Sequence, residues 1–217
     1  IGEIKMYYIV YDNFLPQNEF GILKEYLLNG FPWQFSRRIN SHDEKNDDCY
    51  FASTVFHSHR PPREQWQQGV DLEPFFFITS KLHIEGFQRI KANLYLPSRG
   101  KEVYHHAKHR DGVFKHQGAL FYLTNCDAPT TMDDGYEVQS VENRLLLFDA
   151  TSPHSSSSPT NSSHRVTINF NYWGAGVRME WRHNMPNPNP VISKNMEVLE
   201  KSHFLPIANQ AMTEWGI

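Results

Sequence analysis

The sequence lacks most features that identify secreted, membrane-spanning or nucleic-acid-binding proteins. It has only two cysteines, Cys49 and Cys126, so a secreted-type disulfide framework is excluded and we expect two reduced thiols. Its longest apolar runs, at residues 75–78 and 145–148, are far shorter than the roughly 20 residues that cross a bilayer. A net charge of −3 gives no overall electrostatic attraction to nucleic acid.

Residues 1–5 have neither the basic start nor the apolar stretch of a signal peptide. The formal glycosylation sequon at 161–163 therefore carries no weight, and we expect a cytoplasmic protein that does not contact a membrane. Of the 217 residues, 39% are hydrophobic and 21% are charged, within the range of soluble globular proteins. We expect one domain spanning residues 1–217.

The first half of the chain mixes strand and helix patterns. Residues 6–11 and 50–56 read as strands, and a helix with Phe20, Leu23 and Leu27 on one face should end at residues 29–30. The segment 74–87 should include a helix. A charged run at 41–48 is typical of a solvated loop, and the Asn- and Pro-rich tail at 184–190 precedes a weakly helical stretch.

From residue 88 the pattern changes to strands separated by turns. The clearest is 165–173, where Val166, Ile168, Phe170 and Tyr172 alternate with polar residues. Such regular spacing favours a mostly β sandwich or barrel over a parallel α/β sheet. The predicted strands are 88–96, 102–111, 116–124, 136–139, 143–149 and 165–173.

His109 and Asp111, followed by His154, form the most informative motif. On a strand, residues 109 and 111 point to one face while Arg110 points away. With a histidine from a distant strand they would supply three corners of one octahedral face. Two imidazoles and one carboxylate, with the remaining positions open, are the ligands of non-haem Fe(II) oxygenases.

Arg165 follows His154 by eleven residues and offers a planar fork suited to a carboxylate. Thr167 lies on the same strand face and can donate its hydroxyl to the same ligand oxygen. Tyr122 lies in a predicted strand, where an aromatic residue is usually part of the core.

The twelve histidines also offer rival spacings. His105 and His109 would share a face only on a helix, which the turn at residues 111–112 disfavours. His83 and Glu85 fall in the segment expected to be helical, where such a pair diverges. His164 ranks second to His154 because it should point to the face opposite Arg165. His57 and His59 are a further pair.

His154 lies in the serine-rich segment 151–163, between two predicted strands. Low complexity alone is typical of a flexible surface loop. The flanking strands favour a loop over the mouth of a site.

Taken in order, these motifs resemble the Fe(II)/2-oxoglutarate-dependent dioxygenases, specifically the prolyl-4-hydroxylase-like branch of bacteria and phages. The similarity covers most of residues 6–173. Its matching pieces are residues 9–15, 89–95, His109-x-Asp111, 119–124, 143–149, 153–156 and 165–170.

The resemblance implies a double-stranded β-helix, or jelly roll, with flanking N-terminal helices and a β-helix core at about 88–175. It implies that His109, Asp111 and His154 hold Fe(II), and that 2-oxoglutarate and O2 are co-substrates, with ascorbate as an optional reductant. Arg165 would bind the distal carboxylate of 2-oxoglutarate, assisted by Tyr122. The implied activity is hydroxylation of a small-molecule or peptidyl (prolyl-like) substrate, with release of succinate and CO2.

Two alternatives stay open. Residues 93–95 ahead of His109 also resemble the AlkB-like nucleic-acid dealkylases, but those usually carry a second arginine six residues after the first, where this chain has Asn171. A nucleic-acid partner therefore ranks second. A cupin-like jelly roll that binds a metal and a small molecule without turnover is the other alternative.

The chain also departs from the prolyl-hydroxylase-like pattern at residues 133–137, which affects the substrate-facing turn. Prolyl peptide, free amino acid, small metabolite and nucleobase all remain candidate substrates.

Overall fold

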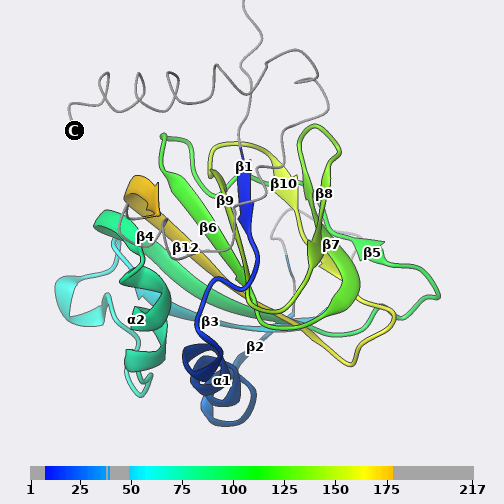
Figure 1. Cartoon of the computed structure of the whole chain (residues 1–217), viewed down its shortest axis with the longest axis horizontal. Coiled ribbons are helices and arrows are strands. Elements are labelled where there is room, and N and C mark those ends of the chain that lie inside the picture. The colour runs from blue at the N-terminus through cyan, green and yellow to red at the C-terminus, as the bar shows by residue number, and fades with distance from the viewer. Residues whose placement is uncertain (1–7, 38, 40–48, 178–217) are drawn as a thin grey trace, which may run out of the picture.

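The computed structural model describes residues 8–37, 39 and 49–177. The predicted loop at 41–48 and the tail at 184–190 lie outside these residues. A seven-stranded antiparallel sheet dominates the fold (Figure 1). Its strands, in spatial order, are β1 (Tyr8–Tyr11), β9 (Arg144–Asp149), β6 (Gln117–Tyr122), β12 (Arg165–Val177), β4 (Leu82–Tyr95), β3 (Tyr50–His57) and β2 (Gln34–Ser36).

Two smaller sheets lie on one side of this large sheet (Figure 1). One has the order β10 (His154–Ser155), β7 (Cys126–Met132) and β8 (Glu137–Ser140), and the other pairs β11 (Ser157–Ser158) with β5 (Tyr104–His105). Facing antiparallel sheets formed by the second half of the chain are the architecture of a jelly roll. The prediction of a mostly β, double-stranded β-helix fold is confirmed.

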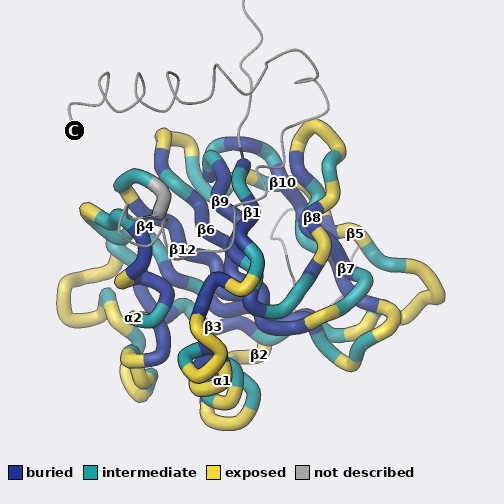
Figure 2. Tube along the Cα trace, in the orientation of Figure 1, coloured by how far each residue is buried: buried dark blue, intermediate teal, exposed yellow. Residues whose placement is uncertain are grey.

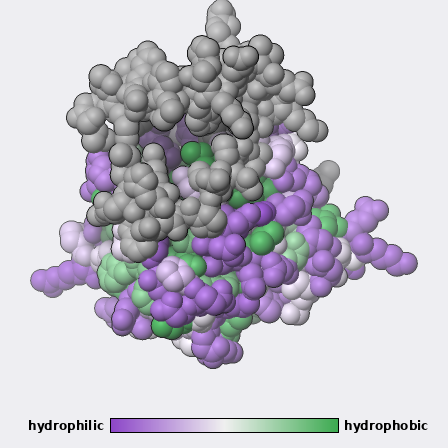
Figure 3. All heavy atoms as spheres, in the orientation of Figure 1, coloured by the Kyte–Doolittle hydropathy of each residue, from purple (hydrophilic) through white to green (hydrophobic). Residues whose placement is uncertain are grey.

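The helices pack on the other side of the large sheet. Helix α1 (Gln17–Glu25) continues into a π-helical turn, η1 (Tyr26–Gly30), and α2 (Glu73–Thr79) follows the short 3₁₀ turn η2 (Pro62–Glu64). Phe20, Leu23 and Leu27 are buried as predicted. None of the helices in the described part of the chain is long and apolar enough to cross a bilayer. The described surface in Figure 3 is mostly hydrophilic with scattered apolar residues.

Side-chain alternation on β12 and β4 divides the molecule into an apolar outer layer and a polar interior. On β12, Val166, Ile168 and Phe170 are buried in the cluster that includes the helices. Their neighbours in sequence point to the opposite face, into the space between the sheets. This interior is buried but polar, since Arg165, Thr167 and Asn169 are all buried. Figure 2 shows the buried colour along β6, β9 and β12, whereas β4 alternates between buried and intermediate residues.

Strand register aligns the polar residues of these two strands. The facing pairs are Arg165 with Tyr95, Thr167 with Asn93, Asn169 with Lys91, and Asn171 with Arg89. A row of polar side chains from two neighbouring strands therefore lines the interior of the jelly roll.

Several predicted boundaries were wrong. The helix in 74–87 ends at Thr79 and β4 already begins at Leu82, so His83 and Glu85 lie on a strand and not on a helix. Strand β7 was not predicted, because its sequence Cys-Asp-Ala-Pro-Thr-Thr-Met contains a proline and has no clear alternation. The predicted strand 102–111 is reduced to Tyr104–His105 and an isolated bridge at His109.

The serine-rich segment is neither a flexible surface loop nor a loop over a site mouth. It forms β10 and β11, and its Ser155, Ser157 and Ser158 are buried. Their small polar side chains hydrogen-bond nearby, as Ser157 Oγ does to the Pro129 carbonyl at 2.6 Å. The backbone of this segment pairs with residues 104–109, which places His154 opposite His109.

Candidate metal centre

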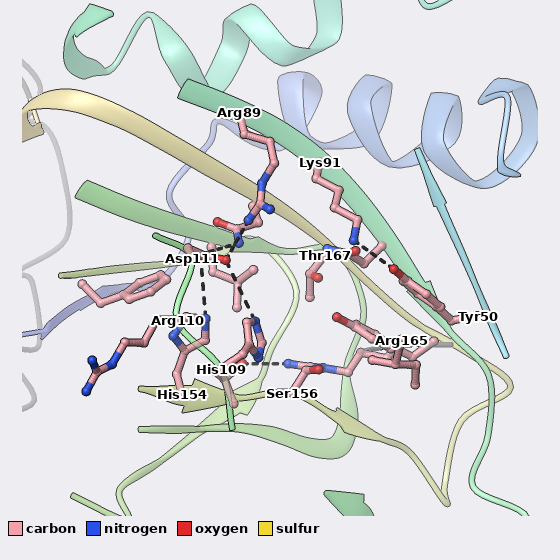
Figure 4. Close-up of a pocket in the computed structure, with 17 residues that line it drawn as sticks. Tyr50, Arg89, Lys91, His109, Arg110, Asp111, His154, Ser156, Arg165 and Thr167 are labelled. Atoms are coloured by element: carbon pink, nitrogen blue, oxygen red, sulfur yellow. Dashed lines mark hydrogen bonds and ion pairs between the residues drawn. The ribbon is translucent and has the colours of Figure 1, made fainter. Parts of the chain in front are cut away.

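One cavity lies between the large sheet and the smaller ones, and its lining contains most of the predicted site (Figure 4). Its volume is about 140 Å³. A single water needs about 10–15 Å³ of such space, so the cavity has room for a small organic molecule beside a metal ion. The lining includes His109, Asp111, His154, Arg165, Thr167, Arg89, Lys91, Asn93, Tyr95, Tyr50, Thr130, Ser156 and Asn169.

Backbone pairing brings the two predicted histidine ligands together. His109 and His154 exchange two N–H···O hydrogen bonds of 2.9 Å, which makes them a directly opposed antiparallel pair. Their ring centroids are 4.6 Å apart. The Asp111 amide then donates to the Ala150 carbonyl at 3.0 Å, which fixes the carboxylate beside both rings.

The three donor atoms fit a single metal ion. His109 Nε2 lies 3.9 Å from Asp111 Oδ1, His154 Nε2 lies 3.8 Å from Asp111 Oδ2, and all three ligand atoms lie within 4.8 Å of one another. Metal bonds to imidazole and carboxylate are about 2.0–2.2 Å long, so two ligands of one ion lie at most about 4.4 Å apart. Both separations between a histidine nitrogen and an Asp111 oxygen are within that limit.

The orientation of His154 and the pKa of His109 both suit metal ligation. His154 Nδ1 lies 3.0 Å from the Ser152 carbonyl, which can only accept, so Nδ1 is the donor and Nε2 is the nitrogen that faces Asp111. Burial, and then the neighbouring His154, lower the pKa of His109 to about 4. The His109 ring is therefore neutral at pH 7, as a metal ligand must be.

Asp111 is held by groups that the sequence motifs did not identify. Its side chain is 2% exposed; Oδ1 accepts a 2.7 Å hydrogen bond from Arg89 Nη2 and Oδ2 accepts one of 2.8 Å from Asn169 Nδ2. Burial alone would raise the pKa of Asp111, but the interactions of its carboxylate with His154, Arg89 and Asn169 outweigh burial, and the pKa lies below its ordinary value. The carboxylate is thus ionised and fixed in orientation.

Arg165 is fully buried, with 0% exposure, and borders the same cavity. Its Nη2 donates to Thr130 Oγ1 at 2.8 Å and its Nη1 to the Ser157 carbonyl at 3.2 Å, whereas Nε has no partner. Within the described residues no carboxylate pairs with it. A buried guanidinium that meets only neutral acceptors is a ready site for an anion.

Thr167 and Tyr122 lie differently with respect to the cavity. Thr167 is 1% exposed and lines it, on the same strand face as Arg165 (Figure 4). Tyr122 is also buried but is not among the lining residues; its hydroxyl donates to Thr130 Oγ1 at 2.8 Å. Thr130 therefore accepts from both Arg165 and Tyr122, and links the tyrosine to the cavity.

The rival histidines are not part of this cluster. His105 is exposed, and its Nδ1 lies 3.4 Å from Thr131 Oγ1. His164 Nδ1 contacts Ser163 Oγ at 2.8 Å, and His57 and His59 contact each other. Arg110 reaches the rim of the cavity but extends away from the metal ligands (Figure 4), as strand alternation predicts.

The polar face of β4 is the largest part of the site that the motifs missed. Arg89, Lys91, Asn93 and Tyr95 all line the cavity, at every second position of the strand. Their alternation with Ile90, Ala92 and Leu94 was visible in the sequence. It signals a strand with a polar buried face, because the apolar set packs against the helices.

Comparisons with known proteins find no matching family model and no matching curated protein. Solved structures do match. A 2OG-Fe(II) oxygenase family oxidoreductase from Burkholderia pseudomallei shares 11% identity over 81% of this chain and 90% of that one, with a TM-score of 0.54. A Trichoplax adhaerens prolyl hydroxylase, in complex with a hypoxia inducible factor peptide fragment, shares 14% over 83% and 87%, with a TM-score of 0.53.

A third similar structure is the non-heme alpha ketoglutarate dependent epimerase SnoN from nogalamycin biosynthesis. It shares 12% identity over 79% of this chain and 77% of that one, with a TM-score of 0.51. At such identities the similarity establishes the fold alone, and the activity has to be inferred from the residues of the site. The chain has the fold of the 2OG-Fe(II) oxygenases.

Proposed function

We propose that this protein is an Fe(II)- and 2-oxoglutarate-dependent oxygenase that hydroxylates a small-molecule or peptidyl substrate and releases succinate and CO2. One observation carries the proposal. A single cavity holds three metal donors on one side and, in Arg165, a fully buried guanidinium with no carboxylate partner among the described residues. A metal ion and a dicarboxylate together would use both features.

Each residue has a defined task in this proposal. His109, Asp111 and His154 would hold the metal through three donors and leave its other positions open. Arg165 would bind the distal carboxylate of 2-oxoglutarate, with Thr167 beside it. Tyr122 would act through Thr130, whose hydroxyl orients the guanidinium. Arg89 and Asn169 would keep Asp111 ionised and in place.

The bound iron and 2-oxoglutarate supply the oxidising chemistry, and the protein supplies orientation and a shielded cavity. The similar folds include a prolyl hydroxylase in complex with a peptide fragment and an epimerase from nogalamycin biosynthesis. These similarities support both a peptide and a small molecule as candidate substrates.

Succinate formation tests this proposal against the cupin-like alternative. The protein is incubated with Fe(II), 2-oxoglutarate, O2 and ascorbate, and with candidate prolyl peptides, amino acids and metabolites. We expect succinate release that depends on iron and stops in His154→Ala. Tight binding of metal and 2-oxoglutarate, with no succinate above the His154→Ala background for any candidate, would establish a binding module.

The dealkylase alternative gains one observation from the structure. Position 171 holds asparagine where dealkylases usually carry a second arginine, but its register partner Arg89 places a guanidinium beside Asp111. With the Asn171 amide nitrogen turned toward Asp111, its oxygen lies 3.2 Å from Arg89 Nη2. Repair of alkylated oligonucleotides, together with salt-dependent binding, would place the dealkylase function first.

A further inference from the structure

Lys91 is a cation in the cavity that neither the metal nor 2-oxoglutarate requires. It extends from β4 toward Tyr50 on β3 and lies beside Thr167 (Figure 4). Its Nζ donates to the Tyr50 hydroxyl at 2.9 Å and lies 5.3 Å from the centre of that ring. An ammonium has three N–H donors, and this hydrogen bond uses one of them.

The charges around the cavity leave Lys91 without a counterion. Four cations line it, Arg89, Lys91, Arg110 and Arg165, and Asp111 is the acidic residue among the lining residues. Arg89 pairs with Asp111, and Arg110 is exposed at the rim. Within the described residues Lys91 forms no ion pair, and burial lowers the pKa of its ammonium. A divalent metal and dianionic 2-oxoglutarate add no net charge, so the cavity would stay positive and Lys91 would still lack a counterion.

Lys91 and Arg165 contact different rings of a stacked aromatic pair. Tyr50 and Tyr95 stack with centroids 5.7 Å apart and an interplanar angle of 13°. Lys91 lies against Tyr50, and the Arg165 guanidinium lies 5.4 Å from the centre of Tyr95. The two cations therefore lie at different places on the wall of the same cavity.

We propose that the primary substrate carries a carboxylate, and that Lys91 and the Tyr50 hydroxyl bind it. This inference rests on the proposed function, because it assigns Arg165 to 2-oxoglutarate. One ammonium and one phenol match a single negative charge, which suits a carboxylate better than a dianionic phosphate. Lys91 and the metal donors border the same cavity, so a small acid held here would present its carbon skeleton toward the metal.

Ligand-observed NMR with propionate tests this subsite, and propionamide is the neutral isostere. The protein is loaded with Zn(II) and saturated with 2-oxoglutarate, so that the metal and Arg165 are occupied. We expect saturation transfer to propionate and little to propionamide. Lys91→Met should weaken propionate binding about tenfold or more, the typical loss for one charge-assisted hydrogen bond. Tyr50→Phe should weaken it less, and Lys91→Arg should retain part of it.

The controls separate the possible failures. Lys108→Met removes an exposed lysine that pairs with Asp133, and it should bind propionate as the wild type does. The affinity for 2-oxoglutarate, measured by calorimetry, should be unchanged in Lys91→Met. If Lys91→Met loses 2-oxoglutarate instead, Lys91 is the co-substrate anchor and the inference is overturned. Equal binding of propionate and propionamide, or tighter binding of inorganic phosphate, would also overturn it. A wild type that binds no 2-oxoglutarate would contradict the proposed function itself.

Discussion

At the scale of single residues, Arg165 is a fully buried charge for which the proposed 2-oxoglutarate would supply the counterion. Its guanidinium is fully buried between the rings of Tyr95 and Tyr122, at 5.4 and 5.7 Å from their centres. Burying a cation without a counterion costs stability, so such a residue is kept where an anion binds. The planar guanidinium is rigid, and the rings of Tyr95 and Tyr122 and its two hydrogen bonds hold it in one orientation.

Replacing Arg165 should therefore weaken 2-oxoglutarate binding even when the charge is kept. We expect Arg165→Lys to lose about tenfold in affinity, because an ammonium cannot reproduce a two-pronged contact, and Arg165→Ala to lose more. Calorimetric titration of 2-oxoglutarate into metal-loaded protein measures both. Arg144→Lys is the matched control, because Arg144 binds both carboxylate oxygens of Asp12 outside the cavity. Unchanged affinity in Arg165→Ala would reject the role of Arg165.

At the scale of secondary-structure elements, the sequence predicts strands well where one face is uniformly apolar. Strand β12 was predicted because Val166, Ile168 and Phe170 alternate with polar residues, and β6 and β9 were found for their apolar content. Strand β7 was missed because its residues Asp127 to Thr131 show neither pattern. The buried Thr130 of this strand is held by hydrogen bonds from Tyr122 and Arg165, and the periodicity of the sequence cannot predict such contacts.

Thr130 on β7 should be important for both stability and co-substrate binding. Thr130→Val removes the acceptor shared by Arg165 Nη2 and the Tyr122 hydroxyl, and leaves two buried donors unpaired. We expect a loss of about 1–3 kcal/mol in the free energy of unfolding and a weaker affinity for 2-oxoglutarate. Urea unfolding and calorimetry measure the two effects. The adjacent Thr131→Val should change both little; equal effects of the two substitutions would contradict this role of Thr130.

The pairing of β5 with β11 should make stability depend on pH. His106 is buried between them, with Nδ1 2.7 Å from Ser156 Oγ and Nε2 3.1 Å from Ser158 Oγ. Burial, and then Arg165, lower the pKa of His106 to about 3. An unfolded histidine has a pKa of about 6.5, so between these values the unfolded chain binds more protons than the folded one.

Above pH 6.5 the titration of His106 therefore does not change the free energy of unfolding, and as the pH drops from 6.5 toward 3 this free energy falls. A difference of one bound proton between the unfolded and the folded chain lowers it by about 1.4 kcal/mol per pH unit. Urea unfolding of metal-free protein between pH 6.5 and 5 avoids most carboxylate titration. We expect His106→Gln, which keeps hydrogen-bonding groups near both serines, to lose less stability than the wild type across this range. Parallel pH profiles of the two proteins would show that His106 takes up its proton normally in the folded state.

At the scale of the whole molecule, the two faces of the large sheet have different tasks. The outer face packs against α1 and α2 through one apolar cluster. The inner face carries Arg165 and Lys91 and borders the cavity that His109, Asp111 and His154 also line. The order of motifs predicted the jelly roll, and five of the six predicted site residues line the cavity: His109, Asp111, His154, Arg165 and Thr167, but not Tyr122. This order could not predict the polar partners on β4 and β7, because they depend on strand register. The assignment of residues 1–217 to one domain stays a prediction.

The coupling between metal and 2-oxoglutarate tests the central claim most directly. Calorimetry under anaerobic conditions compares metal-free protein, Fe(II)-loaded protein and the Asp111→Ala variant, each titrated with 2-oxoglutarate. The three donors and Arg165 line one cavity, so binding should need both the metal and the guanidinium. We predict one molecule of 2-oxoglutarate per chain with iron, and binding at least about tenfold weaker without iron or in Asp111→Ala. Equal affinity with and without iron, or no binding to the iron-loaded protein, would contradict the account.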